Sequence, residues 1–246
     1  MLLRFAAAAL LVVAVTAAAL LPGRGTAVVG ASTCSGWTSH LQPPPTIRVL
    51  RVATDEVQTV RFRRYTKNVL SREWISSWTQ RSLRAGALIV RNYAWYQVLT
   101  WRGGENEAGE CYDIRDDVRD QVFDPTKPIY RTVARAVDGM WSRLVHRNGA
   151  IFPTYYAAGA VDESCGANRN GTRAWQWGTQ ACGLDGYTPG KIVRTYYYPG
   201  VRVFRAASPT PIPTASPTPI PTPTPAASVE PSASPGGPSP SSAPGG

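Results

Sequence analysis

Histidine is scarce in this 246-residue chain, which has only His40 and His146 together with four cysteines. Neither histidine has the spacing of a zinc ligand relative to a cysteine, so no metal site is expected. No arrangement of serine, histidine and acid or of cysteine and histidine is recognisable, and no glycine-rich loop has the form that binds phosphates. A metalloenzyme, a triad hydrolase and a nucleotide-binding protein are therefore not expected, and no cofactor is predicted.

The N-terminal 31 residues have the form of a secretory signal peptide. Arg4 precedes the apolar run Phe5–Leu21, and Val29-Gly30-Ala31 is an acceptable small-x-small cleavage site. The alternative is an uncleaved membrane anchor, because the run is close to the length that spans a bilayer. We therefore expect a secreted, extracellular protein.

The C-terminal residues 206–246 consist mainly of Ser, Thr, Pro, Ala and Gly. Prolines lack amide hydrogens and few of these residues offer apolar burial, so the tail is predicted to be a disordered, extended spacer. Residues 32–45 are expected to be an N-terminal linker, which leaves residues 46–205 as one domain of ordinary size.

Acidic residues are outnumbered by basic ones, 16 against 26, which gives a formal net charge of +10. In the cytoplasm such an excess would favour nucleic acid, but nucleic acid is not an expected partner of an exported protein. Outside the cell, the abundant polyanions are wall polymers, anionic lipid and peptidoglycan carboxylates. A solubilising charge excess without a particular partner is the alternative.

The four cysteines are expected to form disulfides, because an exported chain meets an oxidising compartment and their number is even. Cys165 and Cys182 flank a segment rich in Gly and Asn and are the natural pair, which leaves Cys34 with Cys111. Three connectivities are formally open.

Hydrophobic periodicity predicts an α+β domain with two main helices, short strands and hairpins. Partly alternating β-branched residues over 46–60 predict two strands joined at Thr54-Asp55, and Asn148-Gly149 between apolar runs predicts a hairpin. Helical spacing predicts the remaining elements: a short helix over 62–70, a long buried helix from a capping box at 77–80 to Thr100, and an amphipathic helix over 129–143.

Glu73 is the only acidic residue within residues 57–104, and it has Trp74 beside it and Trp78 one turn further on. Apolar neighbours disfavour an ionised carboxyl and can keep its proton available near neutral pH, as a general acid requires. Indole faces also stack on sugar rings. The alternative is a surface glutamate that pairs with a nearby arginine.

Several blocks of the chain resemble the SpoIID/LytB family. The first is VLSREW at 69–74 with Trp78 and SLRAGALIVRNYA at 82–94, where family members have a glutamate before Met or Trp and "EALKAQAVAARTYA". Further similarities are found at 112–123, at 134–139 and from Gly190 to Gly200. In the family's "GHGxGMSQ" and "YGA" stretch, only Gln176 and Gly178 match.

This resemblance implies a SpoIID-like fold over about residues 46–203 and a role on peptidoglycan. It places the family's catalytic glutamate at Glu73 and its helix arginine at Arg91. It also suggests further substrate-binding residues: Trp74, Trp78, Tyr93, Asp113, Gln121 and Gln176. Asp113 and Gln121 can equally be polar turn residues before a core strand, and Tyr155, Tyr156 and Tyr196–Tyr198 can be sugar platforms or half-buried strand packing.

Three functions are compatible with these features. The first is a lytic-transglycosylase-like enzyme that cleaves glycan strands with Glu73 as acid and base, since one carboxyl suffices when the sugar's own hydroxyl attacks. The second is a non-catalytic module that binds peptidoglycan and enhances a cell-wall amidase. The third is adhesion to anionic polymers through the basic surface.

Overall fold

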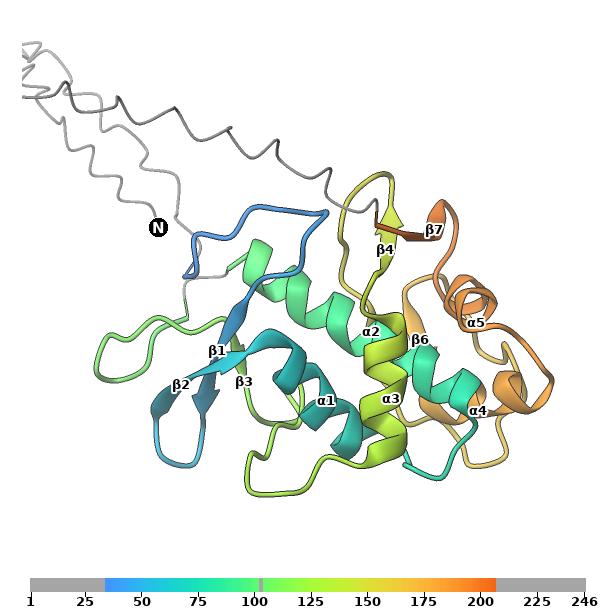
Figure 1. Cartoon of the computed structure of the whole chain (residues 1–246), viewed down its shortest axis with the longest axis horizontal. Coiled ribbons are helices and arrows are strands. Elements are labelled where there is room, and N and C mark those ends of the chain that lie inside the picture. The colour runs from blue at the N-terminus through green and yellow to red at the C-terminus, as the bar shows by residue number, and fades with distance from the viewer. Residues whose placement is uncertain (1–33, 102–103, 207–246) are drawn as a thin grey trace, which may run out of the picture. The chain divides into compact units, whose positions relative to one another are not determined.

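A computed structural model describes residues 34–101 and 104–206, which form an α+β domain with five helices and seven short strands (Figure 1). The elements in chain order are β1 (Thr46–Arg51), β2 (Glu56–Arg61), α1 (Phe62–Glu73), α2 (Gln80–Leu99), β3 (Ile114–Arg115), α3 (Arg131–Met140), β4 (Arg143–Arg147), β5 (Tyr155–Ala157), β6 (Arg173–Trp175), α4 (Gln176–Leu184), α5 (Pro189–Tyr196) and β7 (Val201–Arg205). The expected signal peptide and residues 207–246 of the expected tail lie outside the described residues. None of the helices in the described part is long and apolar enough to span a membrane.

Helix α2 is the centre of the domain, and α1, α3, α4 and α5 all pack against it (Figure 1). Its buried residues lie on every side of the helix and include Leu83, Leu88 and Trp95. A helix that is apolar all round is stable only when neighbours cover it on all sides. The predicted long buried helix is therefore confirmed, and it is the scaffold on which the other elements are placed.

The predicted strands over 46–60 are β1 and β2, which pair antiparallel around the turn before Glu56. β3 adds to the other edge of β1 in parallel, with Val49 opposite Ile114. β1 is the central strand and buries Ile47 and Val49, whereas β2 is a largely exposed edge. Asp55 lies in this turn with a positive φ of 55°, a backbone conformation that Asp adopts more readily than most residues.

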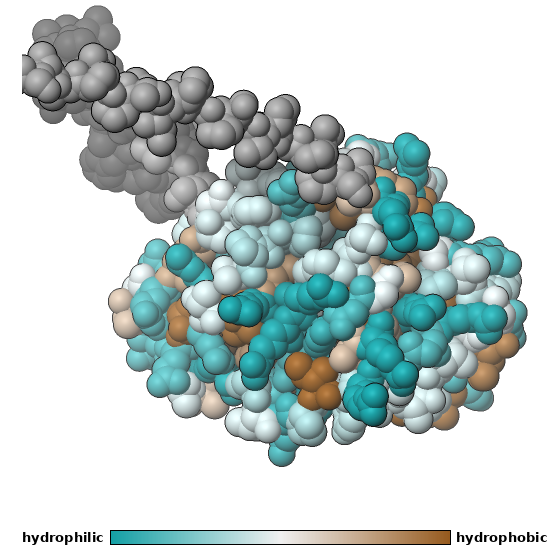
Figure 2. All heavy atoms as spheres, in the orientation of Figure 1, coloured by the Kyte–Doolittle hydropathy of each residue, from teal (hydrophilic) through white to brown (hydrophobic). Residues whose placement is uncertain are grey.

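Helices α1 and α3 lie in front of α2 in Figure 1, and their outer face is hydrophilic (Figure 2). On α1, Phe62, Tyr65 and Val69 are buried at helical spacing, while Arg63 and Arg64 are exposed. α1 continues three residues beyond the predicted end at Leu70. The helix expected over 129–143 is shorter, because it begins at Arg131 and ends at Met140.

One local prediction was wrong and another was confirmed only in part. The N-cap of α2 is Thr79, whose hydroxyl accepts the amide hydrogen of Ser82 at 3.2 Å, and the capping box at 77–80 does not form. The predicted hairpin turn does form, because Asn148 and Gly149 are left-handed and an antiparallel bridge joins Arg147 to Ala150, but the pairing goes no further and β4 pairs with β7 instead. The backbone pairing depends on a partner more than fifty residues away, which local turn chemistry cannot reveal.

The count of two main helices was also too low. α4 and α5 were not predicted, since α4 contains three glycine or cysteine positions and α5 has only eight residues. Both are held by packing against α2, and tertiary contact overrides weak propensity in such short helices.

The cysteines pair as predicted, Cys34 with Cys111 and Cys165 with Cys182. The first disulfide joins the N-terminal stretch to the segment before β3. His40 strengthens this attachment, because its carbonyl contacts His146 Nε2 and its Nδ1 accepts the amide hydrogen of Ile151 at 3.0 Å. Residues 34–45, expected as a linker, thus pack on the domain, and the amide of Ala206 donates to Ser142.

Candidate functional site

Glu73 is the last residue of α1, and its carboxyl group is partly buried. Trp74 follows in an extended conformation with φ of −111° and ψ of 141°, while its amide still donates to Leu70. The chain therefore turns away from the helix immediately after Glu73. This geometry presents the carboxyl at the helix end, where the C-terminal dipole is unfavourable to negative charge.

The carboxyl of Glu73 is held by three donors from other parts of the chain. The backbone N–H of Val122 donates to Oε1 at 2.9 Å, and the side-chain amide of Gln176 donates to Oε2 at 3.4 Å. The hydroxyl of Tyr156 also hydrogen-bonds to it. Burial raises the pKa of Glu73, and these three hydrogen bonds oppose the rise without cancelling it.

A buried hydrogen-bond network fixes Tyr156 behind this carboxyl. Gln121 is 0% exposed, and its amide donates to the Tyr156 hydroxyl at 3.1 Å and to the carbonyl of Val90 at 3.2 Å. The Tyr65 hydroxyl donates to Gln121 Oε1 at 3.1 Å. Burial and then the nearby negative charge of Glu73 raise the pKa of Tyr156, so this hydroxyl stays protonated and remains a donor.

Trp74 forms the apolar side of the site. Its indole N–H donates to Thr179 Oγ1 at 3.2 Å, and its ring lies 5.1 Å from that of Tyr156. The indole can lie against α2 only because residue 86 is glycine: a Cβ there would be 2.7 Å from the indole carbon Cε2. Gly86 thus positions the apolar wall that desolvates Glu73.

Trp78 lies in a separate aromatic pair with Trp177, at 4.8 Å between ring centres and with an edge-to-face arrangement. Trp177 follows Gln176 directly, so this pair adjoins the donor that holds Glu73. Gln180 of the same helix accepts the amide hydrogen of Thr79 at 3.0 Å, which ties the start of α2 to α4. Together these contacts bring two distant segments of the chain to the side of the site.

Arg91 does not contact Glu73 in the described structure. Its guanidinium donates to the carbonyls of Met140 at 3.1 Å, Trp141 at 2.8 Å and Arg143. It is 2% exposed, and burial lowers its pKa to about 10, at which it remains a cation at neutral pH. The geometry gives Arg91 the role of holding the end of α3 to β4, and a substrate cannot reach this side chain directly.

Tyr93 and Asp113 both form hydrogen bonds to other parts of the chain. The Tyr93 hydroxyl donates to Asp120 Oδ1 at 3.2 Å, and its ring contacts both Tyr155 and Tyr156 at 5.8 and 6.5 Å. Asp113 Oδ2 accepts the amide hydrogen of Arg48 at 2.8 Å. Both side chains line a pocket next to the site.

No group of three His, Cys, Asp or Glu side chains within residues 34–101 and 104–206 could hold a metal ion. The two histidines form backbone hydrogen bonds instead, as described above. The site therefore combines one carboxyl of raised pKa, amide and hydroxyl donors and aromatic walls. Such a set can exchange one proton with a polar, uncharged substrate and can stack against its rings.

Three residues that contribute to the site around Glu73 were not predicted from the sequence. Val122 acts through its backbone amide, which no side-chain pattern can indicate, and Tyr65 is one of many buried helix residues. Trp177 was not singled out, although its proximity in sequence to the matching residue Gln176 was a usable signal. Tyr156 was weighed as a sugar platform or as packing, and its hydroxyl in fact contacts Glu73.

Two comparisons with known proteins found similar sequences. Residues 51–142 match the family model described as stage II sporulation protein, SpoIID. An uncharacterized protein of Brachyspira hyodysenteriae (strain ATCC 49526 / WA1) is 28% identical over 94 residues, which are 38% of this chain and 24% of that protein. The chain thus matches only about a quarter of that relative's length.

The family match includes Glu73, Arg91 and Gln121, whereas Gln176 lies beyond it. It supports a role related to the cell wall or to sporulation, and two disulfides are compatible with an oxidising location outside the cytoplasm. The resemblance seen in the sequence motifs is confirmed over residues 51–142, where the chain is similar to the SpoIID family.

Proposed function

We propose that this chain is a secreted lytic-transglycosylase-like enzyme that cleaves peptidoglycan glycan strands with Glu73 as its acid and base. The observation that carries the proposal is the position of the Glu73 carboxyl at the end of α1, with a pKa raised by burial and three fixed donors around it. A raised pKa keeps a proton on the carboxyl nearer to neutral pH, where the leaving oxygen of a glycosidic bond requires it.

One carboxyl can complete this reaction. Protonated Glu73 gives its proton to the glycosidic oxygen as the bond from that oxygen to C1 breaks. The C6 hydroxyl oxygen of the same sugar then bonds to C1, and its proton passes to the Glu73 carboxylate. The products are a shortened strand with a free hydroxyl and a 1,6-anhydro sugar, no water is consumed, and Glu73 returns to its starting state.

The neighbouring residues support each half of this cycle. Gln176, Tyr156 and the Val122 amide fix the orientation of the carboxyl and stabilise its ionised form after proton transfer. Trp74 keeps water from one side. Burial favours the protonated carboxyl of Glu73, whereas the hydrogen-bond donors favour its carboxylate, so both protonation states remain accessible.

A second candidate is a non-catalytic module that binds peptidoglycan and enhances an amidase. The observation in its favour is that both carboxyl oxygens of Glu73 are already engaged by donors of the protein. Glu73 would then serve to fasten the segment around Val122 to the end of α1. In this case the site around Glu73 would recognise the glycan without cleaving it.

The test is mass spectrometry of products after the full-length chain is incubated with intact and with amidase-stripped peptidoglycan. Wild-type protein is expected to release fragments that end in 1,6-anhydro-N-acetylmuramic acid. Glu73→Gln is expected to reduce the rate by about 10²-fold or more, which is typical of a lost general acid. Glu107→Gln, an exposed carboxyl substitution, is the matched control and should retain the rate.

Unchanged thermal unfolding of Glu73→Gln would show that the fold remains, because glutamine keeps the shape and one acceptor oxygen. Fragments of equal amount from Glu73→Gln would contradict the proposed mechanism. Glycan binding by wild-type protein without any fragments would support the amidase-enhancing module instead.

A further inference from the structure

A pocket of about 540 Å³ lies beside β5 and is lined by aromatic side chains from four parts of the chain. These are Tyr93, Trp101, Tyr112 and Tyr155. The volume is within the range of about 300–1,000 Å³ found for small-ligand sites. We call it the Asp113 pocket, after the buried carboxylate in its lining.

Asp113 is 8% exposed, and only one of its oxygens has a partner. Oδ2 accepts the amide hydrogen of Arg48, whereas the buried Oδ1 has no hydrogen bond within the described structure. A buried polar atom without a partner is costly, and most such atoms in folded proteins are satisfied. A ligand hydroxyl or amide N–H in this pocket would provide the missing partner.

The charged groups of the pocket are largely neutralised within the protein. Arg115 lies 3.7 Å from Asp120, and Arg119 is paired with Asp117 at 2.6 Å. Exposed Glu105 and buried Asp113 add negative and not positive potential to the lining. Among the described residues that line the pocket, an anionic ligand would therefore meet no unpaired cation, and a neutral polar ligand is the better fit.

The Asp113 pocket is lined by close sequence neighbours of the residues that hold Glu73. Asp120 lines the pocket, and Val122, two residues later, donates its amide hydrogen to Glu73. Two residues of extended chain span at most about 7 Å. β5 makes the same connection, since Tyr155 lines the pocket while Tyr156, its neighbour with the opposite orientation, reaches the Glu73 carboxyl.

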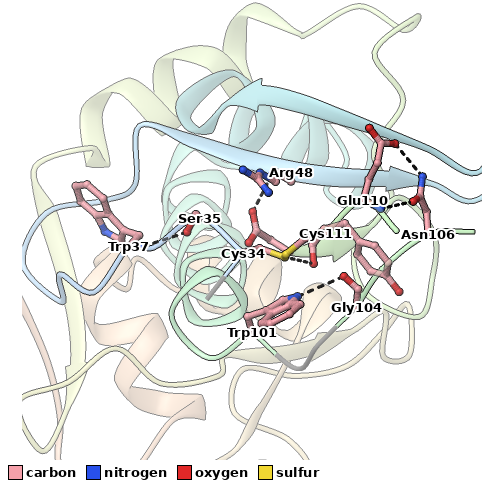
Figure 3. Close-up of a disulfide and its surroundings, with 11 residues drawn as sticks. Cys34, Ser35, Trp37, Arg48, Trp101, Gly104, Asn106, Glu110 and Cys111 are labelled. Carbon is pink, nitrogen blue, oxygen red and sulfur yellow. Dashed lines mark hydrogen bonds between the residues drawn. A yellow bond between two sulfur atoms is a disulfide. The ribbon is translucent and has the colours of Figure 1, made fainter. Parts of the chain in front are cut away.

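The wall that carries Asp113 is held in place covalently. Figure 3 shows the Cys34–Cys111 disulfide, with Arg48 nearby and Trp101 beside Gly104. The backbone amide of Arg48 donates to the Asp113 carboxylate. A single backbone bridge pairs Glu105 with Cys111 across the base of this loop. The pocket is thus largely preformed, which lowers the entropic cost of binding.

We propose that the Asp113 pocket binds a neutral N-acetylhexosamine of the glycan, next to the sugar whose bond Glu73 cleaves, and that Asp113 and Tyr155 select it. This inference rests on the proposed function in taking the glycan as the ligand. Aromatic faces contact the sugar ring, and Asp113 Oδ1 accepts a hydroxyl or acetamido N–H. The two sugars of the glycan alternate, so the neutral sugar would lie in this pocket and the acidic, lactyl-bearing sugar outside it.

Isothermal titration of the full-length chain with a tetramer of N-acetylglucosamine tests this proposal without requiring cleavage. Tyr155→Ala, at a side chain that is 41% exposed, removes a ring contact, and Asp113→Asn replaces the acceptor oxygen Oδ1. Each variant is expected to bind the tetramer about tenfold more weakly. The matched controls, Tyr130→Ala and Asp138→Asn, lie outside the pocket and should bind as wild type does. Polyglycerol phosphate, an anionic wall polymer, is expected to bind this pocket more weakly than the neutral tetramer.

Absence of tetramer binding, equal binding by the pocket and control variants, or a Tyr155-dependent preference for polyglycerol phosphate would each overturn the proposal. The outcome is separate from that of the proposed function. Tetramer binding that depends on Tyr155 without glycan cleavage would reject only the enzymatic role of Glu73, and cleavage without such binding would reject only the Asp113 pocket.

Discussion

Asp113→Asn is expected to change the pH dependence of stability in a way that can be worked out from the structure. Burial raises the pKa of Asp113 from its ordinary 3.8 to about 6, and the hydrogen bond from Arg48 only partly opposes this rise. The folded state therefore binds a proton that the unfolded state has lost between about pH 4 and pH 6. The wild-type free energy of unfolding should fall as pH rises through this window.

The magnitude follows from the two pKa values. A pKa of about 6 against 3.8 corresponds to a destabilisation of roughly 3 kcal/mol by the ionised carboxylate above pH 6. Asparagine does not ionise, and its amide oxygen can still accept the amide hydrogen of Arg48. The difference in unfolding free energy, variant minus wild type, should thus increase by up to about 3 kcal/mol between pH 4 and pH 7.

Urea unfolding of both proteins, followed by tryptophan fluorescence at several pH values with the disulfides intact, measures this difference. The comparison isolates Asp113, because the raised pKa of Glu73 contributes to both proteins alike. A difference that stays constant from pH 4 to pH 7 would refute the reasoning, since it would mean that Asp113 titrates alike in the folded and unfolded chain.

Three further predictions concern other parts of the domain. Arg91→Met should lower the unfolding free energy by about 3–5 kcal/mol, because three buried carbonyls lose their donor, and equal urea midpoints would exclude this role. Replacing Cys165 and Cys182 by serine should cost about 3 kcal/mol by loop entropy over 17 residues, measured against wild type with both disulfides intact, and equal stability of the two proteins would contradict this. Tyr156→Phe removes a hydrogen bond that lowers the pKa of Glu73, so the alkaline limb of the glycan-cleavage rate should shift to higher pH; an unchanged limb would disprove the coupling.

The elements that rest on local periodicity were predictable. The strands β1 and β2, most of α1 and the long α2 follow from patterns of apolar residues within a few turns of chain. The partner of β4 was not, because its pairing with β7 depends on how the intervening helices pack on α2. α4 and α5 have short sequences of weak propensity, and only their contact with α2 stabilises them.

The candidate site was likewise predictable from the sequence only in part. The isolation of Glu73 among apolar and basic residues, with Trp74 beside it, was visible in the sequence and so was its similarity to the family motif. Arg91 belongs to that motif too, yet the structure places its guanidinium at the end of α3, away from Glu73. A motif records which residues occur together and not which of them share a site.

The sequence by itself determined the α+β class and the buried central helix, favoured the cysteine pairs that form, and marked Glu73 as an isolated carboxyl. Only the tertiary structure decided what surrounds that carboxyl: the Val122 amide, the Gln176 amide and the Tyr156 hydroxyl come from segments 49 to 103 residues away. The physical reason is that apolar periodicity depends on residues within a few turns of chain. The pKa of a carboxyl depends instead on its burial and on hydrogen-bond donors, which are in place only when distant segments pack together.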